Sequence, residues 1–359
     1  MSVEFGHPPC PAPGIPARST AARSTAARTR RDRCPGVVRP WPAEDGALVR
    51  LRLPGGRLPG GRLTLAHLAA LVEVAERFGD GRVHVTGRAN LQLRGLPLAS
   101  TGRDLLDDAA LTAIEATGLL PSRAHDRARN VLLSPLTGRA GGRADLRPLL
   151  AAVDAGLLAD PGFADLPGRF LLVLDDGRGD VIGGEERARV DLGLVALDAH
   201  RAQLRVGEAW SSVVPVDEPE EAAATLLGLA RRFLQTRGPG VGAAWHVAEL
   251  PGGAADLAPV RPAEPGAEVA TPPLPHGPVC LGEADGRTLG HHHPVGESGF
   301  GRDEVRAWAA GDLASGPDSG PDRLGAGEVV ITPWRGVLTL APDHSPAPAP
   351  APLTSGDPA

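Results

Sequence analysis

The sequence carries one strand–turn–strand pattern twice, near its two ends. GRVHVTGRANLQLR (81–94) aligns with GEVVITPWRGVLTL (327–340), with glycine, valine, a second aliphatic residue and threonine at matching positions. A helical pattern of apolar residues precedes each copy, at 65–78 and at 303–310. An internal repeat of this kind predicts two related half-domains that flank the rest of the chain.

The order of elements around the first copy indicates the fold class. A strand at 48–53, a helix, a strand pair and a helix at 104–117 give the order β-α-β-β-α. That order begins a ferredoxin-like split βαβ unit. The segment between the repeats mixes strands with helices: strands are predicted at 130–133, 169–174, 190–195 and 244–247, and helices at 146–155 and 219–234.

We therefore predict an α+β fold with two ferredoxin-like half-domains flanking a central α+β domain. The expected boundaries are a disordered tail at 1–33, a half-domain at 34–121, a central domain at 122–260, a linker at 261–277, a half-domain at 278–341 and a disordered Pro/Ala tail at 342–359. Within the first half-domain, the tandem LPGGRLPGGR (53–62) is interpreted as a lengthened loop.

Composition excludes several classes of protein. The net charge of −6 argues against nucleic-acid binding, which usually requires a basic surface. Three cysteines are too few for a disulfide framework and favour a reduced, cytoplasmic location. No apolar run has the length of a membrane span, so no membrane partner is expected.

One face of the first strand pair is wholly polar. Alternation places His84, Thr86, Arg88, Asn90, Gln92 and Arg94 on one side and only apolar residues or glycine on the other. This face could be an ordinary solvated surface of an antiparallel sheet. It could equally bind an anion, because the planar guanidinium of arginine pairs with carboxylates through two parallel hydrogen bonds.

Three further stretches hold candidate residues. HDRARNVLLSPLTG (125–138) places Arg129 and Asn130 before a strand, and LPGRFLLVLDDGRGDV (166–181) places Arg169 at another strand start. The repeated turn TPWRG contains Trp334 and Arg335, which could face a ligand. His291, His292 and His293 are interpreted as a chance surface cluster, so no metal site is predicted.

Together these stretches resemble the nitrite/sulfite reductase family, and most closely its precorrin-3B synthase branch of cobalamin biosynthesis. CPGVVRPWPAEDGALVRLRLPGGR, VHVTGRANLQLRGL, HDRARNVLLSPLTG, LPGRFLLVLDDGRGDV and VVITPWRGV carry the resemblance. It implies a tetrapyrrole, either sirohaem or a precorrin substrate, beside a [4Fe–4S] cluster. The synthases hydroxylate precorrin-3A with dioxygen and close a lactone, so iron and an electron donor are also implied.

The resemblance extends to individual residues. Arg88 matches the arginine of the family's T-x-R strand motif, and Arg129 matches that of its R-N-V motif. Arg169 stands where sulfite reductases have the first lysine of a K-F-K motif, whereas Leu171 stands at the second. The candidate substrate-binding set is Thr86, Arg88, Asn90, Gln92, Arg129, Asn130, Arg169 and Arg335, with no catalytic residue identified.

The chain departs from the family pattern in its cysteines. The family binds its cluster through C-x5-C and C-x3-C pairs, and neither pair occurs in this sequence. The leading hypothesis is a precorrin-3B synthase-like oxidoreductase that binds a carboxylated tetrapyrrole. The alternatives are a non-catalytic or truncated tetrapyrrole-binding homologue, and a sirohaem-dependent sulfite or nitrite reductase.

Overall fold

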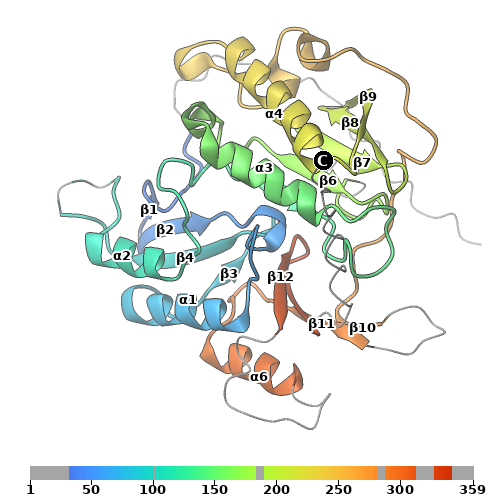
Figure 1. Ribbon diagram of the computed structural model, residues 1–359. Coiled ribbons are helices and arrows are strands. Elements are labelled where there is room, and N and C mark those ends of the chain that lie inside the picture. The colour runs from blue at the N-terminus through green and yellow to red at the C-terminus, as the bar shows by residue number, and fades with distance from the viewer. Residues whose placement is uncertain are drawn as a thin grey trace, which may run out of the picture.

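The chain folds around three β-sheets (Figure 1). The computed structural model describes residues 32–100, 102, 104–182, 190–280, 288–312 and 327–341. The tails predicted at 1–33 and 342–359 therefore lie outside the described residues, apart from Asp32 and Arg33.

The first sheet is antiparallel and has the strand order β1-β2-β4-β3. Its strands are β1 (Trp41–Ala43), β2 (Gly46–Leu51), β3 (His84–Val85) and β4 (Leu91–Leu96). The helices α1 (Leu65–Phe78) and α2 (Asp108–Ala116) pack against each other, and α1 also contacts β4. The odd-numbered residues Val83, Leu91 and Leu93 are fully buried in the shared core, as the alternating pattern predicts.

The second small sheet repeats the first. Its order is β10-β11-β13-β12, formed by β10 (Gly277–Cys280), β11 (Thr288–Pro294), β12 (Glu328–Thr332) and β13 (Gly336–Leu340). Its helix α6 (Arg302–Asp312) packs against α1. The equal strand orders confirm the predicted α+β fold with two ferredoxin-like half-domains.

The half-domains are joined by backbone hydrogen bonds. The amides of Val83 and Phe300 each donate to the carbonyl of the other at 2.8 Å, and the Val329 amide donates to the Leu63 carbonyl at 2.7 Å. The two ferredoxin-like sheets consequently share one apolar core, with Val305 and Ile331 of the second half-domain in the same cluster.

The central sheet has the order β5-β6-β7-β8-β9. Its strands β5 (Val131–Leu133), β6 (Leu172–Asp175) and β7 (Leu192–Ala196) are parallel, whereas β8 (Arg201–Val206) and β9 (Ala209–Pro215) continue it antiparallel. The helices α3 (Arg147–Ala159) and α4 (Pro219–Thr236) lie across one face (Figure 1). The strand predicted at 244–247 is wrong, because that segment leads into a 3-10 turn, Val247–Glu249.

Both faces of the central sheet are buried. In β6, Leu172 and Leu174 belong to the cluster beneath α3 and α4, whereas Val173 belongs to the core shared with the half-domains. This alternation explains the continuous apolar run that precedes Asp175, because a parallel sheet covered on both faces needs apolar residues at successive positions.

The tandem LPGGRLPGGR segment is a loop whose two copies differ in environment. In the first copy, Pro54–Gly56 forms a buried 3-10 turn that contacts β5, α3 and β12. Gly56 has φ +66°, and a Cβ atom there would approach the Ile331 carbonyl oxygen to 1.8 Å. In the second copy, Gly60 has φ +75°, but a Cβ atom would meet nothing within 4 Å. The first copy thus belongs to the junction of all three sheets.

This difference gives a matched stability prediction. Gly56→Ala should destabilise the protein by at least about 3 kcal/mol, because the left-handed backbone and the clash with a backbone oxygen both oppose it. Gly60→Ala carries only the backbone cost of roughly 1 kcal/mol. Urea unfolding of both variants measures the difference, and equal losses would contradict the described packing of the loop.

Candidate functional site

A pocket of about 780 Å³ opens where the two half-domains meet the central sheet. Its wall combines the polar face of the first sheet, the β3–β4 turn, the β12–β13 turn, Leu132 of β5 and the loop that follows β6. Four arginines line it, namely Arg50, Arg88, Arg94 and Arg335, against the two carboxyl groups of Asp180 and Glu297. The pocket is therefore basic within a chain whose net charge is −6.

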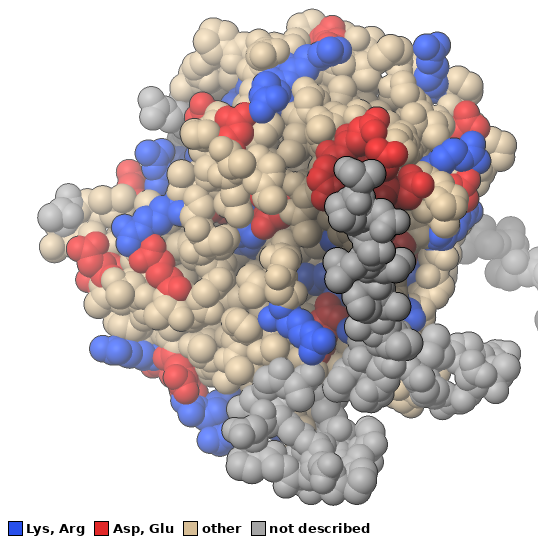
Figure 2. All heavy atoms as spheres, in the orientation of Figure 1, with Lys and Arg blue, Asp and Glu red and all other residues tan. Residues whose placement is uncertain are grey.

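The basic character is local. On the face of the molecule shown in Figure 2, arginines and acidic residues are interspersed, and the largest grouping of one sign is acidic. Concave sites lined by one sign of charge concentrate ligands of the opposite sign. The arrangement therefore favours an anionic ligand in the pocket.

The two turns that enter the pocket have the same conformation. Ala89 and Arg335 occupy equivalent positions and have φ values of 54° and 55°, and no other described non-glycine residue has a positive φ. In each turn a threonine hydroxyl accepts from the amide four residues later, at 3.2 Å from Asn90 to Thr86 and 3.1 Å from Gly336 to Thr332. The repeat thus delivers Arg88 and Arg335 to one cavity from different half-domains.

A row of polar side chains crosses the first sheet beneath these turns. Gln92 on β4 pairs with Arg50 on β2 and with His84 on β3. The Gln92 amide oxygen accepts from Arg50 at 3.3 Å, and in the opposite amide orientation it accepts from Arg94 at 2.9 and 3.2 Å. One amide oxygen cannot serve both guanidinium groups in a single orientation.

The row therefore has more donors than acceptors. Arg50 also donates to the Cys34 sulfur at 3.7 Å, but its buried Nε has no partner among the described residues. A buried donor without an acceptor is costly, at roughly 1–3 kcal/mol. An anionic ligand group in the pocket would supply an acceptor to whichever of the Arg50 and Arg94 guanidinium groups Gln92 does not serve.

Four of the predicted site residues line this pocket: Thr86, Arg88, Gln92 and Arg335. Arg88 is oriented by the Arg169 carbonyl oxygen, which accepts from its Nη1 at 3.0 Å. The Arg169 side chain itself lies outside the pocket. Its guanidinium lies 5.5 Å from the Trp245 ring centre and 3.8 Å from a carboxylate oxygen of Asp32.

The other three predicted residues lie behind the pocket wall. Arg129 forms a buried two-bond ion pair with Asp154 of α3, at 2.6 and 2.9 Å. Asn90 donates to Asn130 at 3.2 Å and accepts from the Leu53 amide. Asn130 in turn donates to the Phe170 carbonyl at 3.2 Å. These bonds fix β2, β4, β5 and β6 relative to one another and so maintain the shape of the wall.

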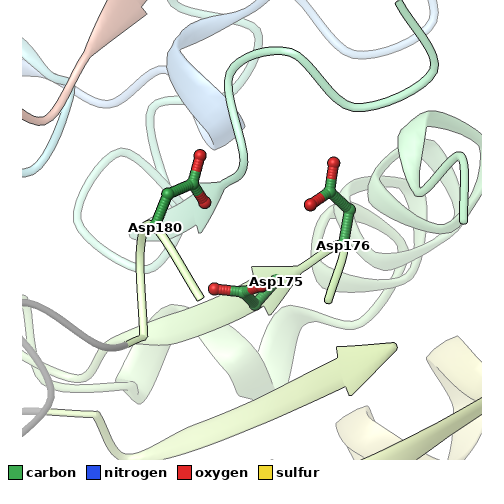
Figure 3. Close-up of side chains that lie close together, drawn as sticks. All are labelled: Asp175, Asp176 and Asp180. Atoms are coloured by element: carbon green, nitrogen blue, oxygen red, sulfur yellow. The ribbon is translucent and has the colours of Figure 1, made fainter. Parts of the chain in front are cut away.

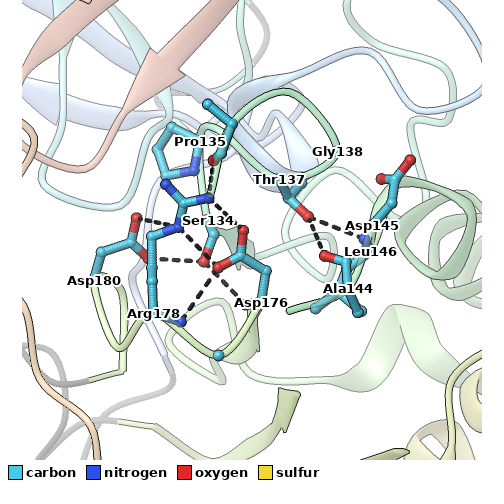
Figure 4. Close-up of polar contacts among 12 residues, drawn as sticks. Ser134, Pro135, Thr137, Gly138, Ala144, Asp145, Leu146, Asp176, Arg178 and Asp180 are labelled. Atoms are coloured by element: carbon cyan, nitrogen blue, oxygen red, sulfur yellow. Dashed lines mark hydrogen bonds and ion pairs between the residues drawn. The ribbon is translucent and has the colours of Figure 1, made fainter. Parts of the chain in front are cut away.

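Three carboxyl groups gather at the end of β6 (Figure 3), and one of them lines the pocket. Oxygens of Asp175, Asp176 and Asp180 lie within 4.8 Å of one another, and all three residues are buried. Asp176 pairs with Arg178 at 2.7 and 2.9 Å, and the Ser134 hydroxyl donates to Asp180 at 2.7 Å (Figure 4). Burial and the neighbouring Asp175 raise the pKa of Asp180 to about 7.

The candidate set from the sequence omitted Arg50, Arg94 and Asp180, although Arg94 was placed on the polar face. Arg94 stands on the same even-numbered face as Gln92, and Arg50 alternates with apolar residues in LVRLRL, so a sheet-level interpretation could have included both. Asp180 has no such signal, because only the folding of the β6 loop toward the first sheet brings it to the pocket.

The three consecutive histidines do not converge on one point. The rings of His291 and His293 lie 4.3 Å apart, whereas His292 is buried between His276 and the Thr332 hydroxyl. Burial lowers the pKa of His293 to about 4, so this ring stays neutral at physiological pH.

Comparisons with known proteins find similarity to the same family that the sequence motifs resemble. The nitrite/sulfite reductase ferredoxin-like half domain matches residues 42–102. A precorrin-3B synthase of Sinorhizobium sp is 40% identical over 92 residues, covering 25% of this chain and 19% of the relative. A ferredoxin–nitrite reductase of Synechococcus elongatus is 34% identical over 146 residues, covering 38% of this chain and 26% of the relative. The matches thus span about a fifth to a quarter of these relatives.

A solved structure extends the likeness of fold. The Mycobacterium tuberculosis NirA protein superposes with a TM-score of 0.57 over 84% of this chain and 57% of its own, at 19% sequence identity. In the part of the chain that is described, no helix combines the length and the apolar character needed to cross a bilayer.

Proposed function

Because the chain belongs to the nitrite/sulfite reductase family, we propose that its basic pocket binds a carboxylated tetrapyrrole. The observation that supports this most is the convergence of four arginines, drawn from both half-domains, on one cavity. Guanidinium groups bind carboxylates through paired, charge-assisted hydrogen bonds. A macrocycle that carries carboxylates around its rim would engage several of them at once.

The [4Fe–4S] cluster of the family does not fit the residues present. Such a cluster takes four thiolates, and these 359 residues include three cysteines. Of the two that are described, Cys34 is buried, with its thiol donating to the Gly168 carbonyl, whereas Cys280 is exposed on β10. We therefore assign no step to a cluster in this chain.

The pocket suits an iron-free ring better than sirohaem. Among the described residues that line the pocket, His84 is the one whose side chain is of a type that commonly binds haem iron. Its Nε2 is 2.9 Å from Asp80 and its Nδ1 is 3.2 Å from the Glu297 carbonyl, so both nitrogens are engaged. A precorrin-type ligand, which needs carboxylate partners and no axial ligand, is therefore favoured over a sulfite or nitrite reductase function.

We assign the predicted residues two kinds of role. Thr86, Arg88, Gln92 and Arg335 would contact the ligand together with Arg50 and Arg94. Arg129, Asn90, Asn130 and Arg169 would position the wall, because their contacts hold β2, β5 and β6 behind it or orient Arg88. In both cases the contribution is binding and orientation of the ligand.

Precorrin-3B synthase-like chemistry is the corresponding reaction, supported by the relative that is 40% identical. A second candidate function is a non-catalytic tetrapyrrole-binding protein. The cysteines favour it, because these 359 residues include too few thiolates for a [4Fe–4S] cluster. Oxygen consumption with precorrin-3A and a reductant distinguishes the two, because only the oxidoreductase consumes oxygen in proportion to substrate. A cytoplasmic location completes the proposal, since both described cysteines are free thiols.

Binding itself can be tested with uroporphyrin, an iron-free ring with an acetate and a propionate on every pyrrole. The purified chain should quench or shift the fluorescence of uroporphyrin, with a Kd of roughly micromolar magnitude. Affinity should fall as salt is added, because the contacts are ionic. A porphyrin with cationic N-methylpyridyl groups is the control. Equal binding of both rings, or no binding of uroporphyrin, would contradict the proposal.

A further inference from the structure

We propose that Asp180 acts in the pocket as a neutral, hydrogen-bond-donating carboxyl group that couples ligand binding to pH. The inference rests on the proposed function, because it concerns the ligand held between the arginines. Its basis is the position of Asp180 in a pocket that four arginines line, together with the unequal hydrogen bonding of the three carboxyl groups at the end of β6.

The three carboxyl groups differ in how their negative charge is stabilised. Asp175 accepts from four backbone amides, those of Gly177, Gly179, Val181 and Ile182. Hydrogen bonds to the charged form favour ionisation. Asp176 is held by the guanidinium of Arg178 (Figure 4). These two residues therefore have partners suited to a carboxylate.

Asp180 has the weakest support for a charge. One of its oxygens accepts from the Ser134 hydroxyl at 2.7 Å, and the other lies 3.8 Å from Nε of Arg178, beyond hydrogen-bonding distance. Two carboxylates this close in a buried site do not both ionise readily. Burial raises the pKa of both Asp175 and Asp180, that of Asp180 to about 7. The backbone amides around Asp175 oppose this rise, so the contacts favour Asp180 as the group that keeps the proton.

This placement has a consequence for a ligand that carries carboxylates. A neutral Asp180 can donate its proton in a hydrogen bond to an acceptor of the ligand, while an ionised Asp180 repels it. The charged or titratable groups around it are Asp175, Asp176 and Arg178 beside it, and Arg50, His84, Arg88, Arg94, Glu297 and Arg335 around the pocket. The arginines keep their charge throughout, and the carboxyl group whose charge is proposed to change is that of Asp180.

The test compares uroporphyrin binding by the wild-type chain and by Asp180→Asn between about pH 6 and about pH 8.5. Asparagine keeps the acceptor for Ser134 and stays neutral at every pH. The ratio of the wild-type Kd to the variant Kd should rise about tenfold across this range, with the rise centred near pH 7. Titration of the ligand contributes to both proteins and cancels in the ratio.

Two further variants separate a specific role from a general loss of charge. Glu297→Gln removes the other carboxylate of the pocket wall, and its Kd ratio to wild type should stay flat with pH. Ser134→Ala removes the hydroxyl that stabilises the Asp180 carboxylate. In this variant background the rise of the Kd ratio should therefore be centred at a higher pH. Thermal unfolding at each pH verifies that every variant is folded under the conditions of binding.

The outcomes are distinguishable. A rising ratio with the shift in Ser134→Ala supports the inference. Uroporphyrin binding with a flat wild-type to Asp180→Asn ratio overturns it and leaves the proposed function standing. No binding to the wild-type chain overturns the proposed function and this inference together.

Discussion

Replacing Arg50 and Arg335 together by glutamine is expected to weaken uroporphyrin binding by about a hundredfold or more. The two side chains enter the pocket from different half-domains, Arg50 from β2 and Arg335 from the β12–β13 turn. Hydrogen bonds that involve a charged group contribute about 1.5–3 kcal/mol each, so each single variant should lose roughly tenfold to a hundredfold. Fluorescence titration of the single and double variants measures these losses.

Arg302→Gln is the matched control for that experiment. It removes the same charge from an exposed pair with Glu76 on the helical side of the half-domains, away from the pocket. The affinity of this variant for uroporphyrin should change less than about twofold, because exposed charges outside the pocket are largely screened by salt. Similar losses in Arg302→Gln and in the pocket variants would indicate a general effect of net charge and would contradict a site at the pocket.

Glu328→Ala is expected to destabilise the protein by about 3–5 kcal/mol, because it leaves buried charge without its partner. Glu328 on β12 forms ion pairs with Arg57 of the tandem loop and with Arg139 of the central domain, the latter at 2.7 Å. Arg57 is buried, and the side chains of Arg139 and Glu328 are only 9% and 12% exposed. Together the three residues join the two half-domains to the central domain. Glu304→Gln, which loses an exposed pair with Arg82, should cost less than about 1 kcal/mol. Urea unfolding of the two variants measures the difference.

The contribution of Glu328 to the free energy of unfolding should also depend on pH. Burial would raise the pKa of this carboxyl, but the attraction of Arg57 and Arg139 outweighs it and lowers the pKa below its ordinary value of 4.5. The stabilisation is therefore complete above the unfolded-state pKa and is lost as pH falls through the lower folded-state value. The stability difference between wild type and Glu328→Gln should accordingly shrink in acid. A difference that is independent of pH would contradict the ionised state of Glu328.

The repeat and its strand pairs could be predicted because their pattern is local. Alternation in 81–94 separates a polar face from an apolar one, and the turn that begins at Thr86 recurs at Thr332. By contrast, β8 and β9 were not predicted, because RAQLRV and AWSSVVP carry polar residues at buried positions. Gln203, for example, is buried and bonds to backbone carbonyls of the 259–264 segment and β9. Only the tertiary structure provides those partners.

The candidate site could likewise be predicted from the sequence only in part, because some of its contacts depend on tertiary structure. The polar face of β3 and β4 was recognised as a possible anion site, and it does form one wall of the pocket. Sequence could not separate Arg88, which enters the pocket, from Arg129, which pairs with Asp154, because both stand in arginine-containing motifs of similar appearance. The difference depends on α3, which brings Asp154 to Arg129 from a distant part of the sequence.

A crystal structure of the chain grown with uroporphyrin would show whether a carboxylated tetrapyrrole binds between the two equivalent turns. We expect the ring between the Thr86 and Thr332 turns, with its carboxylates within hydrogen-bonding distance of guanidinium groups from both half-domains, including Arg50 and Arg335. A ring bound elsewhere, or one that contacts a single half-domain and none of the pocket arginines, would contradict it.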